Sequence, residues 1–256
     1  MKLAHYTYGA GPIKLIFLHG FCENNTCFNK QVLFFKDHYT VQTIDLPGFG
    51  SSLPTGTGTS MKSMAEAVLE CLNLNPNEKV FLMGHSMGGY VGLELLKLIP
   101  NQIQGFGLIH STPLADSEER KQKRKQVLAF IEKYGKQKYL ESFFPGLFRE
   151  GNYEPHKDFL LAEAMKSTEQ GISEAVLAMM NREDNLAFLV NLEIPVFWGI
   201  GKEDALIAES SLFEMATQCK TSYIAYLKES AHMSMFEESD LLNWNLNQFF
   251  KTFNQD

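Results

Sequence analysis

The sequence has no apolar run that approaches the roughly 18 residues that a membrane span needs. Its N-terminal segment has no long apolar stretch before a small-residue cleavage site, since Lys14 interrupts the best run, residues 13–18. Cysteine is scarce, and the four cysteines form neither a C-x-x-C pair nor a cluster with histidines: Cys22, Cys27, Cys71 and Cys219. We therefore expect a cytoplasmic protein with free thiols and no membrane span, a Cys22–Cys27 disulfide being the alternative.

Positive charge is also scarce, because 23 lysines and arginines stand against 30 aspartates and glutamates, which gives a net charge of −7. A phosphate backbone rewards lysine and arginine, so this balance disfavours nucleic acid as a partner. Two glycine loops, residues 9–11 and 48–50, lack both the lysine of a phosphate-binding loop and the spacing of a dinucleotide fingerprint. We expect a small-molecule partner and no cofactor. The sequence gives no indication of the oligomeric state.

Short apolar runs alternate with segments of helical pattern along most of the chain. The expected strands are residues 13–18, 39–44, 80–83, 103–109, 194–200 and 221–227. The expected helices between them are residues 60–72, 90–99, 208–218 and 240–253. This alternation predicts an α/β fold with a mostly parallel central sheet, helices on both faces, and a ligand site at the carboxyl ends of the strands.

The alternation is interrupted once, between residues 113 and 185, where no convincing strand pattern occurs. The helical patterns in this interval cover residues 118–134, 137–144, 156–165 and 171–180. We therefore predict a core of residues 1–112 and 186–256, and a helical cap, or lid, of residues 113–185 inserted before the last two strands. Since the cap follows a strand end, it is expected to roof the ends of the strands.

A G-x-S-x-G sequence, residues 84–88, follows the third expected strand and precedes a helical segment. Strand, tight turn and helix are the context in which this pattern presents a nucleophilic serine above a sheet. The turn strains the backbone at Ser86, and the glycines two residues before and after it leave room for close packing. We predict that Ser86 is a nucleophile; the alternative is a glycine-rich turn with an incidental serine.

Taken together, these features resemble the α/β-hydrolase superfamily over nearly the whole chain. The motifs that carry the resemblance are His19-Gly20-Phe21, Asp45 to Ser52, Gly84 to Gly89, Gly201 to Asp204, and Ala231-His232. Within the superfamily, the chain is similar to small lidded esterases and monoacylglycerol-lipase-like enzymes. Only a short segment, residues 3–9, precedes the first long strand, so one of the family's early antiparallel strands is expected to be missing or abbreviated.

The resemblance implies a catalytic triad in the chain order serine, acid, histidine. A serine hydroxyl needs a nearby base, and His232 is the one histidine of the seven that follows the last expected strand. Asp204 follows the preceding strand and is expected to orient the imidazole. Glu203 and Asp116 are the alternative acids. Asp45 also ends a strand, and we interpret it as a turn and capping residue.

The same resemblance implies an oxyanion hole formed by the backbone N–H groups of Phe21 and Met87. His19 is expected mainly to shape its loop through local hydrogen bonds, with substrate contact as a tentative second role. Three apolar cap residues are tentative substrate contacts: Phe143, Phe144 and Met179. No metal site is expected.

All four arginines of the chain lie in the predicted cap: Arg120, Arg124, Arg149 and Arg182. Since arginine binds carboxylates through paired hydrogen bonds, one interpretation is that they hold an acidic substrate. The interpretation that we favour is solvated surface, for the arginines and for the charged run of residues 118–125 alike.

The expected function is hydrolysis of carboxylic esters with short to medium acyl groups, through an acyl-enzyme on Ser86. Thioesters and lactones are cleaved by the same machinery. One alternative keeps the fold and changes the reaction to carbon–carbon bond hydrolysis, or to a lyase reaction, on an acidic substrate. A second alternative is a weakly catalytic ligand receptor.

Overall fold

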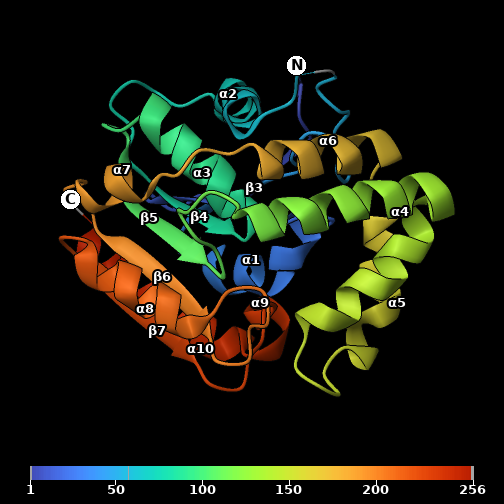
Figure 1. The fold of residues 1–256 in the computed structure, drawn as a ribbon. Coiled ribbons are helices and arrows are strands. Elements are labelled where there is room, and N and C mark those ends of the chain that lie inside the picture. The colour runs from blue at the N-terminus through green and yellow to red at the C-terminus, as the bar shows by residue number, and fades with distance from the viewer. Residues whose placement is uncertain (1, 57, 255–256) are drawn as a thin grey trace.

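The computed structural model describes residues 2–56 and 58–254, and a seven-stranded sheet forms its centre (Figure 1). The strands are β1 His5–Tyr8, β2 Lys14–Leu18, β3 Thr40–Ile44, β4 Val80–His85, β5 Ile103–Ile109, β6 Val196–Gly201 and β7 Ser222–Leu227. Their order is β1-β3-β2-β4-β5-β6-β7, and only the pairing of β1 with β3 is antiparallel. The ends of the predicted core, residues 1 and 255–256, lie outside the described residues.

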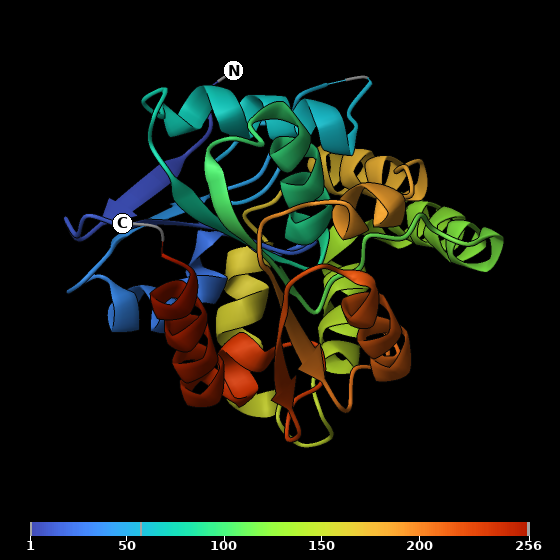
Figure 2. The same cartoon turned by 90° about the vertical axis from the view of Figure 1, so that its left-hand side faces the viewer.

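Helices cover both faces of the sheet (Figure 2). On one face lie α1 (Asn29–Phe35) and α10 (Ser239–Phe253), and on the other lie α2 (Met61–Leu72), α3 (Met87–Leu98) and α8 (Glu209–Gln218). Two short helices, η1 (Asn25–Phe28) and α9 (Ser234–Glu237), lie in loops. The apolar face of α10 is fully buried: Leu242, Leu246, Phe249 and Phe250. The predicted α/β fold with a mostly parallel sheet is confirmed.

Every predicted strand and core helix is present, with ends that differ by at most a few residues. The elements that the sequence analysis did not predict are short. β1 has four residues and α1 has seven, which is too little for either periodicity to be read clearly. β1 is the antiparallel strand of the expected abbreviated N-terminal region.

Between β5 and β6 the described chain forms helices joined by loops, and no strand. The helices are α4 Glu118–Phe143, η2 Phe144–Leu147, η3 Glu154–His156, α5 Lys157–Ala164, α6 Glu169–Met180 and α7 Leu186–Val190. Figure 1 shows α4, α5 and α6 gathered on the side of the molecule toward which the parallel strands point. α4 bends at Gly135, which has a φ of 79°, a backbone conformation that glycine adopts with little strain. This bend falls in the predicted gap between the helical patterns of residues 118–134 and 137–144.

None of the described helices combines the length and the apolar character that crossing a membrane requires. All four cysteines are free thiols, so the alternative of a Cys22–Cys27 disulfide is not realised.

Candidate active site

Ser86 lies in the sharp turn between β4 and α3, with backbone angles of φ 49° and ψ −115°. A residue with a side chain rarely adopts positive φ, so the surrounding packing must hold this conformation in place. The packing is close, because a Cβ at Gly88 would lie 2.1 Å from the carbonyl oxygen of Leu18. A Cβ at Gly84 would lie 2.5 Å from the backbone of Gly88. The two glycines thus let the Ser86 turn fold tightly against β2.

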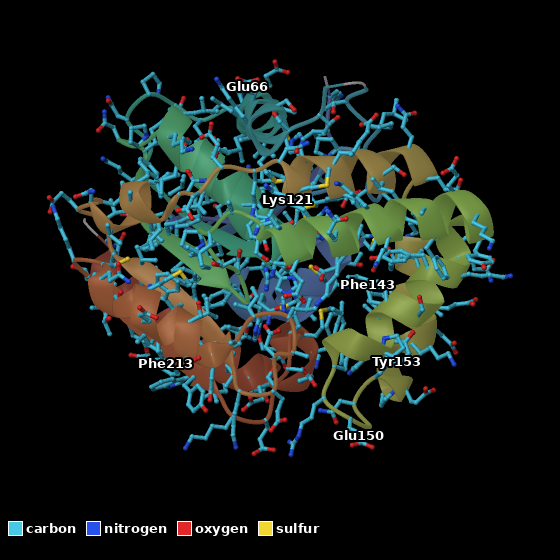
Figure 3. The ribbon with its side chains drawn as sticks, in the orientation of Figure 1. Glu66, Lys121, Phe143, Glu150, Tyr153 and Phe213 are labelled. Carbon is cyan, nitrogen blue, oxygen red and sulfur yellow. The ribbon has the colours of Figure 1, made fainter. Side chains whose placement is uncertain are left out.

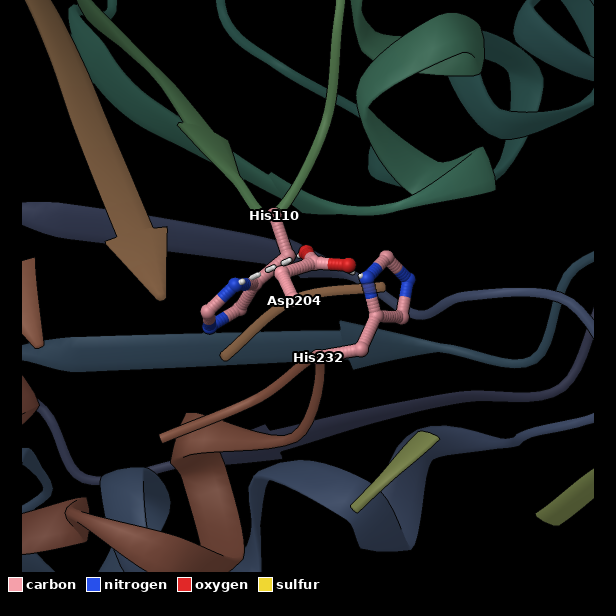
Figure 4. A group of neighbouring side chains, drawn as sticks. All are labelled: His110, Asp204 and His232. Carbon is pink, nitrogen blue, oxygen red and sulfur yellow. Dashed lines mark hydrogen bonds and ion pairs between the residues drawn. The ribbon is translucent and has the colours of Figure 1, made fainter. Parts of the chain in front are cut away.

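Asp204 and His232 meet beyond the carboxyl ends of β6 and β7 (Figure 4). Nδ1 of His232 lies 2.8 Å from Oδ2 of Asp204, and both side chains are buried. Oδ1 of Asp204 accepts the backbone N–H groups of Leu206 and Ile207 at 2.8 and 3.1 Å. Burial disfavours a charged carboxylate, but the neighbouring imidazoles of His232 and His110 outweigh it and hold the pKa of Asp204 well below its ordinary value. Asp204 is therefore a charged hydrogen-bond acceptor for Nδ1 of His232.

The two alternative acids are placed differently. Asp116 is bound by two arginines, with its carboxylate 3.0 Å from Nε of Arg124 and 2.6 Å from Nη1 of Arg182. Glu203 is exposed to solvent. The hydrogen bond from His232 favours Asp204 over both.

A cavity of about 530 Å³ lies beside this pair, and both Ser86 and His232 line it. Nε2 of His232 is buried and has no hydrogen-bond partner in the part of the chain that the structure describes. Since Nδ1 faces Asp204, Nε2 is the ring atom left to take up a proton. A cavity of this size accommodates a small molecule. A molecule bound in the cavity would therefore lie beside both the hydroxyl of Ser86 and the imidazole of His232.

His110 follows β5 and places a second imidazole beside Asp204 (Figure 4). Its Nδ1 lies 3.5 Å from the same carboxylate oxygen, and its Nε2 lies 2.7 Å from the hydroxyl of Ser234. Burial lowers the pKa of His110 to about 4, so the ring is neutral at pH 7. If Ser234 donates to Nε2, the single ring proton sits on Nδ1 and faces Asp204. The sequence analysis assigned no role to this residue.

One group of side chains within residues 2–56 and 58–254 has potential metal-ligating atoms that lie within 4.8 Å of one another: His110, Asp204 and His232. Both imidazoles direct Nδ1 at the same oxygen of Asp204. A metal centre needs lone pairs that point at one ion, whereas Nδ1 of His232 is hydrogen-bonded to Asp204, and Nδ1 of His110, 3.5 Å from the same oxygen, makes no hydrogen bond among the described residues. We therefore interpret the group as an acid with two imidazole neighbours, and the absence of a metal stays a prediction.

Glu23 and His85 form a buried ion pair that the sequence analysis missed. Nδ1 of His85 lies 3.0 Å from Oε2 of Glu23, and its Nε2 donates to the carbonyl oxygen of His232 at 2.9 Å. The same glutamate oxygen accepts the backbone N–H of Gly20 at 2.9 Å. Burial opposes both charges, but the His85 charge and hydrogen bond lower the pKa of Glu23 to about 2, and Glu23 raises the pKa of His85. The pair ties the loop at Gly20 to the backbone of the histidine base.

Replacing Glu23 by glutamine is expected to destabilise the fold by about 3 kcal/mol, because it leaves His85 buried without its counter-charge. The stabilisation from Glu23 is complete above its ordinary pKa of 4.5 and is lost as the pH falls toward about 2. The stabilisation from His85 is complete below its ordinary pKa of 6.5 and is lost as the pH rises through its raised pKa. The difference in urea unfolding free energy should therefore be largest between pH 4.5 and 6.5.

The matched control is Glu78→Gln, which removes a partly exposed carboxylate paired with Lys14 and should change stability little. A loss in Glu23→Gln that stays constant across the pH range would show that the Glu23–His85 pair is not charged.

The two predicted oxyanion donors come from two segments, the loop after β2 and the start of α3. Phe21 lines the cavity and follows Gly20, where a Cβ would lie 2.7 Å from Nδ1 of His85. Met87 is the first residue of α3, so its N–H group belongs to the unpaired first turn of a helix. The positive end of the helix dipole favours negative charge at this point.

Of the tentative substrate contacts, Phe143 and Met179 line the cavity, and Phe143 lies on the second part of α4 (Figure 3). Phe144 is fully buried and does not line it. His19 is also buried and outside the lining. Both of its ring nitrogens bond to backbone atoms, since Nδ1 lies 2.8 Å from the Gly20 carbonyl and Nε2 accepts an N–H at 2.9 Å. These bonds fit the expected loop-shaping role.

The expectation that the cap arginines lie on solvated surface is wrong for Arg182. Arg182 is buried against Asp116, while Arg120 and Arg124 line the cavity. Arg120, Arg124 and Arg149 are all partly exposed, and Arg149 pairs with Glu229 outside the cavity lining. Residues 118–125 are all exposed or partly exposed, as the solvated-face interpretation expects, but residues three and four apart on a helix share a face, and one such face meets the cavity.

The family model described as alpha/beta hydrolase fold matches residues 14–171. The chain belongs to this family. The motif-based resemblance is thereby confirmed, and with it the prediction of an α/β-hydrolase enzyme.

Among curated relatives, this α/β-hydrolase is 28% identical over 250 residues to the dihydrolipoyllysine-residue acetyltransferase component of the acetoin cleaving system of Pseudomonas putida. The match covers 95% of this chain and 65% of that protein. The corresponding protein of Cupriavidus necator is 34% identical over 119 residues, or 46% of this chain and 31% of that protein. The chain thus spans less than two thirds of the length of either relative.

Among solved structures, a thermophilic esterase from Thermogutta terrifontis, with malate bound, superposes with a TM-score of 0.89 at 24% identity. The superposition covers 99% of this chain and 94% of the esterase. An enol-lactonase from Burkholderia xenovorans LB400 superposes with a TM-score of 0.88 at 16% identity, covering 97% of this chain and 96% of that one. At these identities the comparison establishes a shared fold.

Proposed function

We propose that this α/β-hydrolase cleaves carboxylic esters with short to medium acyl groups, using Ser86 as nucleophile, His232 as base and Asp204 as orienting acid. The observation that carries the proposal is that Ser86, in its strained turn, and His232 line one cavity. Nε2 of His232 has no hydrogen-bond partner among the described residues, and the other ring nitrogen, Nδ1, is hydrogen-bonded to Asp204. The names of the esterase and the enol-lactonase of similar fold both describe cleavage of an acyl–oxygen bond.

In the first half of the proposed reaction, the Ser86 hydroxyl attacks the ester carbonyl and passes its proton to Nε2 of His232. The imidazolium that forms is stabilised by Asp204, which stays charged throughout. The tetrahedral oxyanion accepts hydrogen bonds from the backbone N–H groups of Phe21 and Met87. His232 then donates its proton to the departing alcohol, which leaves the acyl group on Ser86.

In the second half, a water molecule takes the place of the alcohol and gives a proton to His232 as it attacks the acyl-enzyme. The same oxyanion site holds the second tetrahedral intermediate. When it collapses, the acid is released and Ser86 regains its proton from His232. Every proton in this cycle moves through Nε2 of His232, while Asp204 on Nδ1 keeps the ring in the tautomer that leaves Nε2 free to accept a proton.

The proposal is tested with p-nitrophenyl esters of increasing acyl length, compared by kcat/KM. We expect turnover of the short and medium esters and a decline for long chains, because a cavity of about 530 Å³ must contain the acyl group. Stoichiometric labelling of Ser86 by a fluorophosphonate without ester turnover would favour carbon–carbon bond hydrolysis, a lyase reaction or a ligand receptor. If the protein is not labelled by the fluorophosphonate and does not turn over any of the esters, the assignment of Ser86 as the nucleophile is contradicted.

A further inference from the structure

One wall of the catalytic cavity is basic, although the protein as a whole carries a net charge of −7. Arg120, Lys123 and Arg124 all line the cavity that Ser86 and His232 border. They are spaced by three and four residues on α4, so they lie on one face of that helix. We name these three residues the α4 basic wall.

The charge of this wall is only partly cancelled by neighbouring carboxylates. Lys123 pairs with Glu119 at 2.7 Å. Arg124 shares the carboxylate of Asp116 with Arg182. For Arg120, no ion pair occurs among the described residues, and its guanidinium donates to the carbonyl oxygen of Leu206. With the charged carboxylate of Asp204 beside His232 also counted, four cations stand against three carboxylates, which leaves an excess of one positive charge beside the cavity.

The geometry of Arg124 leaves part of its side chain available to a ligand. Nε donates to Oδ2 of Asp116 at 3.0 Å, and the structure gives its terminal nitrogens no hydrogen bond within the described residues. Asp116 is itself fixed by the buried Arg182. The aspartate thus holds one edge of the Arg124 guanidinium, while the other edge keeps the paired donors that suit a carboxylate.

Glu23 also lines the cavity, but it does not offset the positive charge of the α4 basic wall. Its carboxylate is already paired with His85 and with a backbone N–H group. The remaining wall is largely apolar and includes Val127, Phe143 and Leu147. A ligand that matches the cavity is therefore amphipathic, with an apolar stretch and one anionic group.

We propose that the α4 basic wall binds a carboxylate group of the substrate, so that the physiological substrate is an ester whose acyl or alcohol part is itself an anion. This proposal rests on the proposed function. It deepens that function by naming the substrate class. The binding energy of the remote carboxylate would hold the scissile ester near Ser86 and raise kcat/KM for acidic esters.

The test compares three matched esters: mono-p-nitrophenyl adipate, its methyl-capped neutral diester, and p-nitrophenyl hexanoate. We expect the wild-type protein to prefer the anionic ester by about tenfold or more in kcat/KM, which is the usual effect of one charge-assisted hydrogen bond. Arg120→Gln, Lys123→Gln and Arg124→Gln should each lower the ratio of anionic to neutral kcat/KM, and the triple variant should lower it most, while Asp116 keeps its ion pair with Arg182. Added salt should reduce the ratio as well.

Lys121→Gln is the matched control, because it removes the same charge from the same helix outside the cavity lining (Figure 3). Its ratio should equal that of the wild type. An equal kcat/KM for the anionic and neutral esters in the wild type, or an unchanged ratio in the triple variant, would overturn the proposal.

Binding of adipate to Ser86→Ala, measured by calorimetry, separates this inference from the proposed function. Adipate binding that weakens at least tenfold when Arg120 and Lys123 are also replaced supports the basic wall, even if no ester is hydrolysed. Ester turnover that depends on Ser86, together with no adipate binding and no charge preference, would leave the proposed function standing and reject the wall as an anion site.

Discussion

Replacing Ser86 by alanine is expected to lower kcat for a good p-nitrophenyl ester by about a millionfold, the loss that removal of a serine nucleophile causes in a hydrolase triad. The hydroxyl is the group that forms the acyl-enzyme, and no other residue of the site replaces its position at the tip of the β4–α3 turn. The residual rate should be that of water attack in the oxyanion site, about a thousandfold above the uncatalysed reaction.

Ser142→Ala is the control for this change, since Ser142 also lines the cavity but its hydroxyl donates to the carbonyl oxygen of Tyr139. It should keep most of the wild-type kcat. Circular dichroism of both variants should match the wild type, because alanine removes one oxygen atom and leaves the backbone unchanged. A Ser86→Ala protein that retains a tenth of the wild-type rate would show that the nucleophile lies elsewhere.

Asp204→Asn is expected to lower kcat by about ten-thousandfold, as in other triads in which the acid becomes an amide. An amide donates where the carboxylate accepts, so the hydrogen bond to Nδ1 of His232 would select the tautomer that carries its proton on Nε2. Nε2 would then be unable to take up the serine proton. The loss also removes the charge that stabilises the imidazolium.

Glu203→Gln is the control for the acid, because Glu203 precedes Asp204 in the chain and was the nearest alternative. We expect its kcat to stay close to that of the wild type. KM for Asp204→Asn should change much less than kcat, since Asp204 acts through His232 and is not among the residues that line the cavity. A large loss in Glu203→Gln with none in Asp204→Asn would reverse the assignment of the acid.

The strands, the core helices and the positions of Ser86, Asp204 and His232 at strand ends could be predicted because each depends on local sequence. A buried parallel strand is a short apolar run, and the β4–α3 turn requires glycines at fixed positions around its serine. The break in α4 was also predictable, since Gly135 interrupts a long helical pattern.

The Glu23–His85 pair could not be predicted in this way, because the two residues are 62 positions apart and meet only when β4 packs beside β2. No periodicity or motif marks Glu23 as buried. The one available indication was that Glu23 is a charged residue two positions after the His19-Gly20-Phe21 motif.

The sequence analysis weighed the arginines of the α4 basic wall as ligands of an acidic substrate but favoured solvated surface, for a different reason. The charges of residues 118–125 are consistent with a solvated helix face, and the sequence does not say which side of α4 meets the cavity. Helical spacing alone groups Arg120, Lys123 and Arg124 on one face, but their exposure to a ligand depends on how α4 lies across the strand ends.

The central claim is that Ser86 carries the acyl group between the two halves of the reaction. The most direct measurement is mass spectrometry of the protein quenched in acid during turnover of a p-nitrophenyl ester, followed by proteolysis. The account predicts that the mass of one acyl group is added to the peptide that contains Ser86. An acyl group found on a different residue, during turnover that Ser86→Ala leaves intact, would contradict it.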